Sequence, residues 1–150
     1  MADDLVIVGA GPAGMSAAIR AVEAGVPVTL LDEAPRPGGQ IYRQPPATFE
    51  VRDPRALGAE YLRGQALIQR FVGHAARIQH WSETQVWGVF PAARGQAPTP
   101  VAAEVAILRA GRVSRIAART LIVATGASER AVPFPGWTLP GVFTAGGVQI

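Results

Sequence analysis

The sequence of 150 residues contains no cysteine and no lysine. Without cysteine, these residues offer no disulfide, no thiolate ligand for a metal or an iron–sulfur cluster, and no dithiol chemistry. All 14 basic residues are arginines, spread between Arg20 and Arg130, and the net charge is only +3. A surface that binds nucleic acid concentrates its basic residues and interleaves aromatic ones, so we expect no nucleic-acid binding.

Long apolar runs and clustered histidines are also missing. No apolar run approaches the ~20 residues that cross a bilayer, so we expect no membrane span. The apolar run at residues 5–10 follows Asp3 and Asp4 rather than a basic segment, so we expect no signal peptide. His74 and His80 stand six residues apart without clustered carboxylates, which predicts two partly solvated surface histidines and no metal site. Together these absences favour a cytoplasmic protein.

The composition favours a packed domain. Apolar residues make up 49% of the chain and charged residues 17%, which is too hydrophobic for a disordered chain. The length suits one domain or a piece of a larger protein. Residues 131–150 contain three prolines and four glycines and end without a helix cap. We therefore expect residues 1–150 to be the truncated N-terminal portion of a larger protein, with residues 131–150 beginning the linker to a second domain.

The first 32 residues predict a βαβ unit. Residues 5–9 form a continuous apolar run with β-branched members, typical of a strand buried on both faces. Residues 12–24 carry apolar side chains at helical spacing, with Pro12 in the first turn and Gly25 where a helix would end. Residues 26–31 then form a second apolar run, which predicts a second buried strand.

A long loop and a helix are expected next. Residues 34–54 contain five prolines and two glycines, which predicts an irregular loop, and long loops of this kind are usually functional or disordered. Asp53 and Pro54 mark the start of a helix that reaches Gly73. Its expected apolar face consists of Leu57, Tyr61, Leu62, Ile68, Phe71 and Val72.

The rest of the chain favours strands. Residues 86–90, 101–108 and 113–117 predict an antiparallel meander of about three strands, with a hairpin turn at residues 109–112. Residues 120–124 form another apolar run, expected to return to the parallel sheet. The fold class is therefore α/β, with a mostly parallel Rossmann-like sheet, helices on its faces and an inserted antiparallel meander.

Residues 9–14 match the pattern G-x-G-x-x-G between the first strand and the first helix. Gly9 permits a tight turn, Gly11 lets the backbone approach a pyrophosphate, and Gly14 lets the helix pack close to the strand. The phosphates would meet free backbone N–H groups at the positive end of the helix dipole. The pattern predicts dinucleotide binding rather than a purely structural βαβ unit, and by itself it does not choose between NAD and FAD.

The second strand ends at two acidic residues. Asp32 and Glu33 follow the glycines by about 20 residues, where a carboxylate accepts hydrogen bonds from ribose hydroxyls. A carboxylate at this place repels a 2′-phosphate, so we expect no NADP there. Asp32 stands at the strand tip and is the preferred acceptor, with Glu33 as the alternative.

Three segments together carry a family resemblance. Residues 6–14 resemble the FAD fingerprint of flavoproteins with two dinucleotide-binding domains, and residues 38–40 (Gly-Gly-Gln) and 120–127 (with Ala-Thr-Gly) resemble two further markers of that group. Within the group, residues 31–43 and 124–142 resemble the FAD subunits of opine oxidase, hydrogen cyanide synthase and hydroxyproline dehydrogenase. The redox cysteines of thioredoxin reductases and glutathione reductases have no counterpart in this chain.

The resemblance implies FAD as cofactor and an amine or imino-acid substrate that gives a hydride to the flavin. The alternative is a non-catalytic subunit that holds the cofactor or relays electrons while a partner subunit oxidises the substrate. We expect an oligomer, and weak FAD binding without turnover by residues 1–150 alone. The residues expected at the cofactor are Gly9, Gly11, Pro12, Ala13, Gly14, Asp32, Glu33, Gly39, Gln40, Ala124, Thr125 and Gly126.

Other residues leave two interpretations open, and no catalytic acid or base is identifiable. Trp81, Trp87 and Trp137 could stack on a ligand, although Trp87 is expected in the core and Trp137 as a loop anchor. Arg36 and Arg43 could meet a pyrophosphate or lie in solvent. By resemblance, Tyr42 and Gln40 would lie near the flavin.

Overall fold

A single six-stranded sheet organises the chain, and the computed structural model describes residues 3–46, 48–91 and 101–149. The elements are β1 (Asp3–Val8), α1 (Pro12–Glu23), β2 (Val28–Leu31), the 3₁₀ turn η1 (Pro54–Leu57), α2 (Gly58–Gly73), β3 (Ile78–Trp81), β4 (Thr84–Pro91), β5 (Ala103–Arg109), β6 (Arg112–Val123) and α3 (Ala145–Gln149). Among the helices of these described ranges, none is long and apolar enough to span a bilayer.

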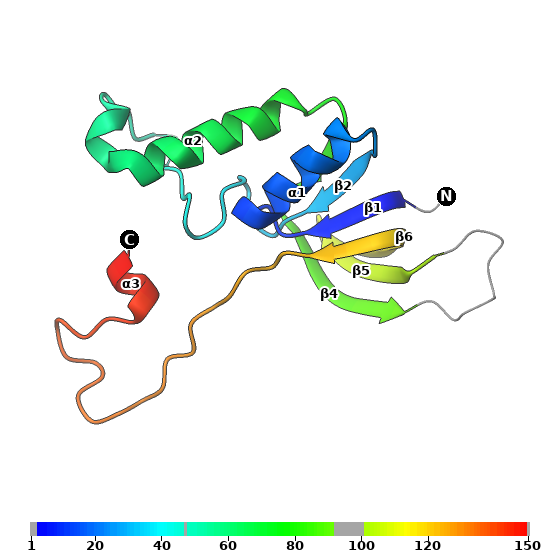
Figure 1. The fold of residues 1–150 in the computed structure, drawn as a ribbon. Helices are drawn as coiled ribbons and strands as arrows, with labels where there is room; N and C mark the ends of the chain where they lie inside the picture. The colour runs from blue at the N-terminus through cyan, green and yellow to red at the C-terminus, as the bar shows by residue number, and fades with distance from the viewer. Residues whose placement is uncertain (1–2, 47, 92–100, 150) are drawn as a thin grey trace.

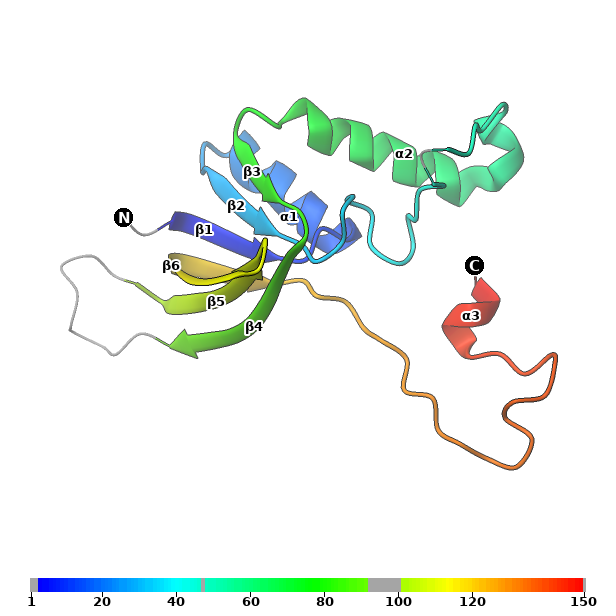
Figure 2. The same ribbon diagram turned by 180° about the vertical axis from the view of Figure 1, so that it is seen from behind.

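The strand order is β3-β2-β1-β6-β5-β4. The pairings β3–β2, β2–β1 and β1–β6 are parallel, whereas β6–β5 and β5–β4 are antiparallel. The predicted α/β class, with a mostly parallel sheet and an antiparallel meander, is confirmed. The expectation of helices on both faces is wrong for the described residues, because α1 and α2 lie on the same face (Figure 1). The curved strands of the meander stand on the other side, as Figure 2 shows from behind.

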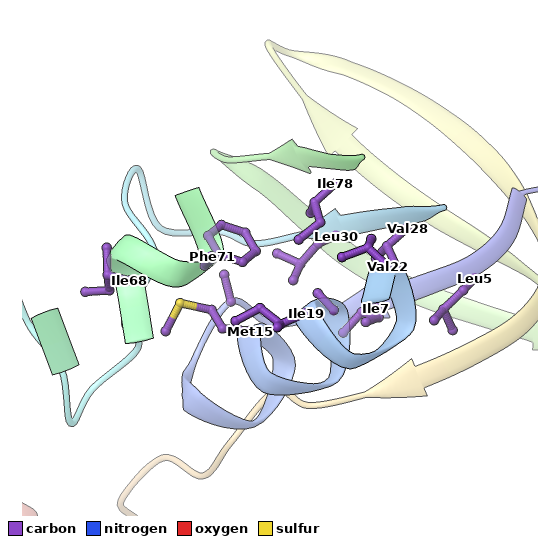
Figure 3. Close-up of a cluster of buried hydrophobic side chains, with 12 residues drawn as sticks. Leu5, Ile7, Met15, Ile19, Val22, Val28, Leu30, Ile68, Phe71 and Ile78 are labelled. Carbon is purple, nitrogen blue, oxygen red and sulfur yellow. The ribbon is translucent and has the colours of Figure 1, made fainter. Parts of the chain in front are cut away.

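Strand β1 is buried on both faces, as its continuous apolar run predicts. On the helical face, Ile7 and Leu30 pack against Met15 and Ile19 of α1, with Phe71 of α2 closing the cluster (Figure 3). On the opposite face, the alternating residues of β1 join a second cluster with the meander; its buried members are Val6, Val8, Leu31, Val105, Ile107 and Ala118. Two clusters on the two faces of one strand explain why no polar residue interrupts residues 5–8.

Strand β6 corrects the predicted boundary between the meander and the parallel sheet. Residues 113–117 and 120–124 were expected as separate strands, but residues 113–117 and 120–123 belong to the single strand Arg112–Val123, and only Ala124 lies beyond it. Its first half pairs with β5 and its second half with β1, and Ala118 pairs with both Ala103 and Asp3. One strand therefore changes from antiparallel to parallel neighbours along its length, and no turn is needed between the halves.

Strand β3 was missing from the predicted elements. Ile78–Trp81 pairs in parallel with β2, yet only Ile78 among its four residues is fully buried. Gln79 and His80 break the apolar pattern, so the segment carries no period by which a strand could be identified. Because β3 is an edge strand, its pairing with β2 tolerates these polar residues.

The predicted apolar face of α2 is only partly correct. Asp53 accepts a hydrogen bond from the Arg55 N–H at 3.0 Å and so caps η1, and α2 itself begins at Gly58. Ile68 and Phe71 are buried against the core, while the other members of the expected face are exposed or only partly buried; the exposed ones are Leu57, Leu62 and Val72. The first half of α2 extends past α1 and the sheet (Figure 1), so its apolar residues have no core beneath them.

The tryptophans lie at the surface of the sheet and of the loops. Trp87, expected in the core, is 54% exposed because it points outward from the edge strand β4, where it meets the Phe90 ring edge to face. Trp81 packs against the second cluster and lies under the Arg109 guanidinium, 5.0 Å from the ring centroid. Trp137 lies in a turn, where its N–H donates to the Phe134 carbonyl oxygen at 3.0 Å. Its side chain is exposed, so it does not hold the loop against the core as expected.

His80 departs from the expected surface location. Its ring meets Phe71 edge to face with centroids 5.6 Å apart, and its Nε2 is buried without a hydrogen-bond partner among the described residues. Burial of the imidazole lowers the pKa of His80, and the charge of Asp32 opposes this shift. His74 does lie near the surface, with Nε2 3.8 Å from a Glu23 carboxylate oxygen.

The lowered pKa of His80 predicts a loss of stability in mild acid. The unfolded chain takes up the His80 proton near an ordinary pKa of about 6.5 and the folded chain only at lower pH. The neutral His80 ring therefore allows the full free energy of unfolding above about pH 6.5. This free energy falls as the pH drops through the lowered pKa of His80 in the folded chain. We expect the free energy of unfolding to fall less between neutral pH and about pH 5 in His80→Phe than in the wild type.

The control for this prediction is His74→Gln, which removes the other histidine and should retain the fall. Urea unfolding at a series of pH values measures the effect. An equal fall in His80→Phe and in the wild type would contradict the assignment to His80.

Candidate functional site

A cavity of about 790 Å³ opens where β1, β2 and β6 end. This volume lies within the range of small-molecule and cofactor sites, and the carboxyl ends of parallel strands are where α/β sheets bind ligands. Eleven of the twelve predicted cofactor residues line it, namely Gly9, Gly11, Pro12, Ala13, Asp32, Glu33, Gly39, Gln40, Ala124, Thr125 and Gly126. The twelfth, Gly14, is buried in α1 and is not among the lining residues.

The turn after β1 requires glycine for steric reasons. Gly9 has φ +104°, and its N–H donates to the Leu31 carbonyl oxygen at 2.7 Å. A Cβ on Gly14 would stand 1.8 Å from the Gly9 carbonyl oxygen, so α1 packs directly on the turn. A Cβ on Gly9 would stand 2.3 Å from the Ala124 carbonyl oxygen. The turn is thus enclosed between α1 and the segment that follows β6.

The amino end of α1 faces the cavity without a side chain to cap it. Gly11 is the N-cap, Pro12 takes the first position, and no acidic residue lies in the first turn. The first N–H groups of a helix have no intrahelical partner and carry the positive end of its dipole. Ala13, which lines the cavity, therefore offers a backbone donor to an anion, and a pyrophosphate is a suitable one.

The loop after β2 closes onto this turn. The Gly38 N–H donates to the Ala10 carbonyl oxygen at 2.9 Å, and a Cβ on Gly39 would stand 2.9 Å from the Gly11 Cα. Two glycine backbones thus lie against each other at the cavity wall. Tyr42 packs against Gly64 of α2 and is partly buried there, so it does not line this cavity.

Arg36 and Arg43 line the cavity but already have partners in their own loop. Arg36 donates to the Gln44 carbonyl oxygen at 3.3 Å, and the Arg43 guanidinium donates to the Gln40 side-chain oxygen. Both arginines are exposed, and each retains further N–H donors. They therefore give the cavity a positive wall beyond the amino end of α1.

The two acidic residues after β2 differ in their surroundings. Asp32 is partly buried; its Oδ1 accepts from the Ala34 N–H at 2.7 Å and its Oδ2 accepts from the Ala10 N–H. Glu33 is exposed at the cavity wall and has no such backbone partner in the described part of the chain. Each Asp32 oxygen thus accepts one backbone N–H and keeps the capacity to accept from a ligand, and both acidic residues line the cavity.

Strand β4 adds a further wall that was not predicted from the sequence. Thr84, Val86 and Val89 line the cavity, although they belong to the antiparallel meander. Thr84 is buried, and its N–H donates to the Asp32 carbonyl oxygen at 2.8 Å. Only the curvature that carries β4 back beside β2 places these side chains at the site, and no motif encodes that curvature.

A comparison with known protein families covers the residues that line this cavity. The family model described as pyridine nucleotide-disulphide oxidoreductase matches residues 3–148. The chain belongs to this family. FAD is the cofactor of the family, and the free N–H groups of α1, the close glycine contacts and the acidic strand end fit a dinucleotide of that kind. Because the chain has no cysteine, these residues do not supply the disulphide chemistry in the family's name.

Two curated relatives within the family match nearly the whole chain. An opine oxidase subunit from Agrobacterium tumefaciens (strain Ach5) is 46% identical over 98% of this chain and 28% of its own length. The hydrogen cyanide synthase subunit HcnB of Pseudomonas aeruginosa is 43% identical over 97% of this chain and 29% of its own length. The predicted resemblance is confirmed, and the chain spans less than a third of these relatives.

A solved structure supports the fold. The L-proline dehydrogenase from P. horikoshii superposes with a TM-score of 0.64 at 22% identity, covering 88% of this chain and 24% of that protein. At this identity the likeness concerns the fold alone, and it agrees with the sheet and helix arrangement described above.

Proposed function

We propose that the chain binds the adenosine and pyrophosphate moieties of FAD in an oxidoreductase that oxidises an amine or imino acid. The observation that carries the proposal is the convergence of the glycine turn, the uncapped end of α1 and the Gly39 backbone in one cavity. The substrate class is supported by the likeness to one of the subunits of opine oxidase. When bound, FAD supplies the capacity to accept a hydride.

Each part of the cavity then has a role in binding or orientation. The free N–H groups at the start of α1, with Ala13 at the cavity wall, hold the pyrophosphate, and the Asp32 carboxylate, with Glu33 as the alternative, accepts from the adenosine ribose. The remaining predicted residues, Gly39, Gln40, Ala124, Thr125 and Gly126, line the path of the cofactor toward the flavin. The apolar side chains of β4 keep water from one side of that path.

A second candidate is a protein that holds the cofactor or relays electrons while a partner oxidises the substrate. The relatives favour it, because both are named as subunits of an oxidase or a synthase. In that case the same cavity binds FAD, and the substrate-binding residues belong to another chain.

Anaerobic flavin reduction distinguishes the two candidates. The full-length protein, alone and with its partner subunit, is mixed with a panel of secondary amines and imino acids, and the loss of visible flavin absorbance is followed. Reduction by the isolated chain supports an enzyme, and reduction only with the partner supports the second candidate. Failure of every amine and imino acid in both arms would contradict an oxidation at a C–N bond.

Residues 1–150 alone are expected to associate and to bind FAD more weakly than the full-length protein. The segment after β6 runs away from the sheet toward α3 (Figures 1 and 2) and exposes several large apolar side chains. These are Val132, Phe134, Leu139, Phe143 and Val148. Exposed apolar surface of this kind promotes association. Light scattering with a parallel FAD titration measures both properties, and a monomer that retains stoichiometric FAD through gel filtration would contradict the expectation.

A further inference from the structure

The loop after β2 separates two cavities. The cofactor cavity lies on one side of the loop, and a second cavity of about 1170 Å³ lies on the other side, bounded by α2 and α3. The residues that line both cavities are Gln40, Ile41, Arg43 and Gln44. Tyr42 stands in the middle of these residues, lines only the second cavity and packs against the core beside α2. Because the loop has open space on both sides, we looked for what Tyr42 does to hold it in place.

A notch in α2 receives the side chain of Tyr42. Gly64 is buried in the middle of this helix, and a Cβ on it would stand 2.7 Å from the Tyr42 Cγ and Cδ1 and 3.0 Å from the Tyr42 Cβ. Because the contact includes the Tyr42 Cβ, rotation of the ring about the side-chain bonds cannot relieve it. Glycine lowers the helix propensity of this place relative to alanine, and it leaves the space that Tyr42 fills.

Gly38 connects Tyr42 to the glycine turn after β1. The Tyr42 N–H donates to the Gly38 carbonyl oxygen at 3.2 Å, and the Gly38 N–H donates to the Ala10 carbonyl oxygen at 2.9 Å. Gly38 has φ +132°, and a Cβ on it would stand 2.3 Å from the Tyr42 carbonyl oxygen. The next residue, Gly39, lies against the Gly11 backbone in the cofactor cavity. Backbone contacts therefore transmit a displacement of Tyr42 to the turn that faces the cofactor.

From these contacts we infer that Tyr42 is a positioning residue of the FAD site, and that the notch at Gly64 sets the place of the loop that forms the cavity wall. The inference rests on FAD binding by this cavity. The competing role, which the family resemblance implies, is a direct contact between Tyr42 and the flavin. The two roles differ at Gly64, because this residue does not line the cofactor cavity and affects FAD only through Tyr42.

The first experiment measures urea unfolding of the cofactor-free, full-length protein. Gly64→Ala is made in the wild type and in Tyr42→Ala. In the wild type we expect it to lower the free energy of unfolding, because the new Cβ collides with Tyr42. In Tyr42→Ala the notch is empty, so the higher helix propensity of alanine should make the same substitution stabilising. Gly73→Ala, where a Cβ meets nothing within 4 Å, is the matched control and should have the same effect in both backgrounds.

The second experiment follows the loop and the cofactor in the same full-length variants. We expect Gly64→Ala and Tyr42→Ala each to weaken FAD binding about tenfold or more, since both displace the loop. Tyr42→Phe keeps the atoms that fill the notch and should recover the wild-type affinity within about twofold, with an unchanged visible flavin spectrum. Hydrogen exchange of the cofactor-free protein should accelerate in peptides that contain the Gly38 and Tyr42 amides in the first two variants, and not in Tyr42→Phe.

Two results would overturn the inference. One is an equal effect of Gly64→Ala on stability in both backgrounds, which would mean that Tyr42 does not occupy the notch. The other is a Tyr42→Phe protein that loses FAD affinity or changes the flavin spectrum while Gly64→Ala binds FAD normally, as a direct contact with the flavin requires. A wild type that binds no FAD would instead overturn the proposed function, and the stability and exchange measurements would still decide whether Tyr42 holds the loop.

Discussion

Gly14→Ala is expected to abolish measurable FAD binding and to lower the free energy of unfolding by about 3 kcal/mol or more. The added Cβ would stand 1.8 Å from the Gly9 carbonyl oxygen and 3.5 Å from the Ala124 Cβ. Because the nearest atom belongs to the backbone, no side chain can move aside, and α1 must shift away from β1. That shift displaces the N–H groups at the start of α1 from the pyrophosphate position.

Urea unfolding and FAD titration of the full-length protein measure the two effects of Gly14→Ala. Gly73→Ala is the matched control, because Gly73 also lies in a helix, at the end of α2, and a Cβ there meets nothing within 4 Å. We expect this control to change stability by no more than about 1 kcal/mol, with FAD affinity unchanged. Equal behaviour of the two alanine variants would disprove close packing of α1 on the turn.

Gly9→Ala is expected to reduce FAD affinity about a hundredfold or more by moving the turn itself. Gly9 combines φ +104° with a Cβ position 2.3 Å from the Ala124 carbonyl oxygen. The substitution therefore strains the backbone and also pushes the turn away from the segment after β6. Strain alone is worth about 1–3 kcal/mol, and the collision adds to it.

Gly25→Ala separates these two causes. Gly25 has φ +92°, and a Cβ there meets nothing within 4 Å, so the variant has the strain without the collision. We expect a modest loss of stability and normal FAD affinity. If Gly9→Ala and Gly25→Ala lose stability equally and both retain FAD, the contact between Gly9 and Ala124 has no role in the site.

The first half of the fold could be predicted from the sequence because its signals are local. The apolar run at residues 5–8, Pro12 and Gly25 each act within a few residues, and the βαβ unit formed as expected. The later strands depend on neighbours far along the chain. The continuity of β6 through Ala118 follows from its simultaneous pairing with β1 and β5, which no local period reveals.

In the candidate site too, the residues marked by local sequence patterns could be predicted, whereas contacts between distant segments could not. The residues of the glycine turn and of the Ala-Thr-Gly segment were predicted from spacing and resemblance, and the structure brings them to one cavity. The bond from the Ala10 N–H to the Asp32 carboxylate could not be predicted, because it depends on the parallel register that brings the end of β2 beside the turn after β1. The outward face of Trp87 likewise follows from the position of β4 at the sheet edge.

The cofactor content of the purified full-length protein tests most directly whether this cavity binds FAD. The bound nucleotide is released by denaturation, identified by mass and quantified against protein concentration. We expect FAD at one molecule per chain, lost in Gly14→Ala and retained in Gly73→Ala. A bound nicotinamide dinucleotide without any flavin would contradict the assignment of this site to FAD.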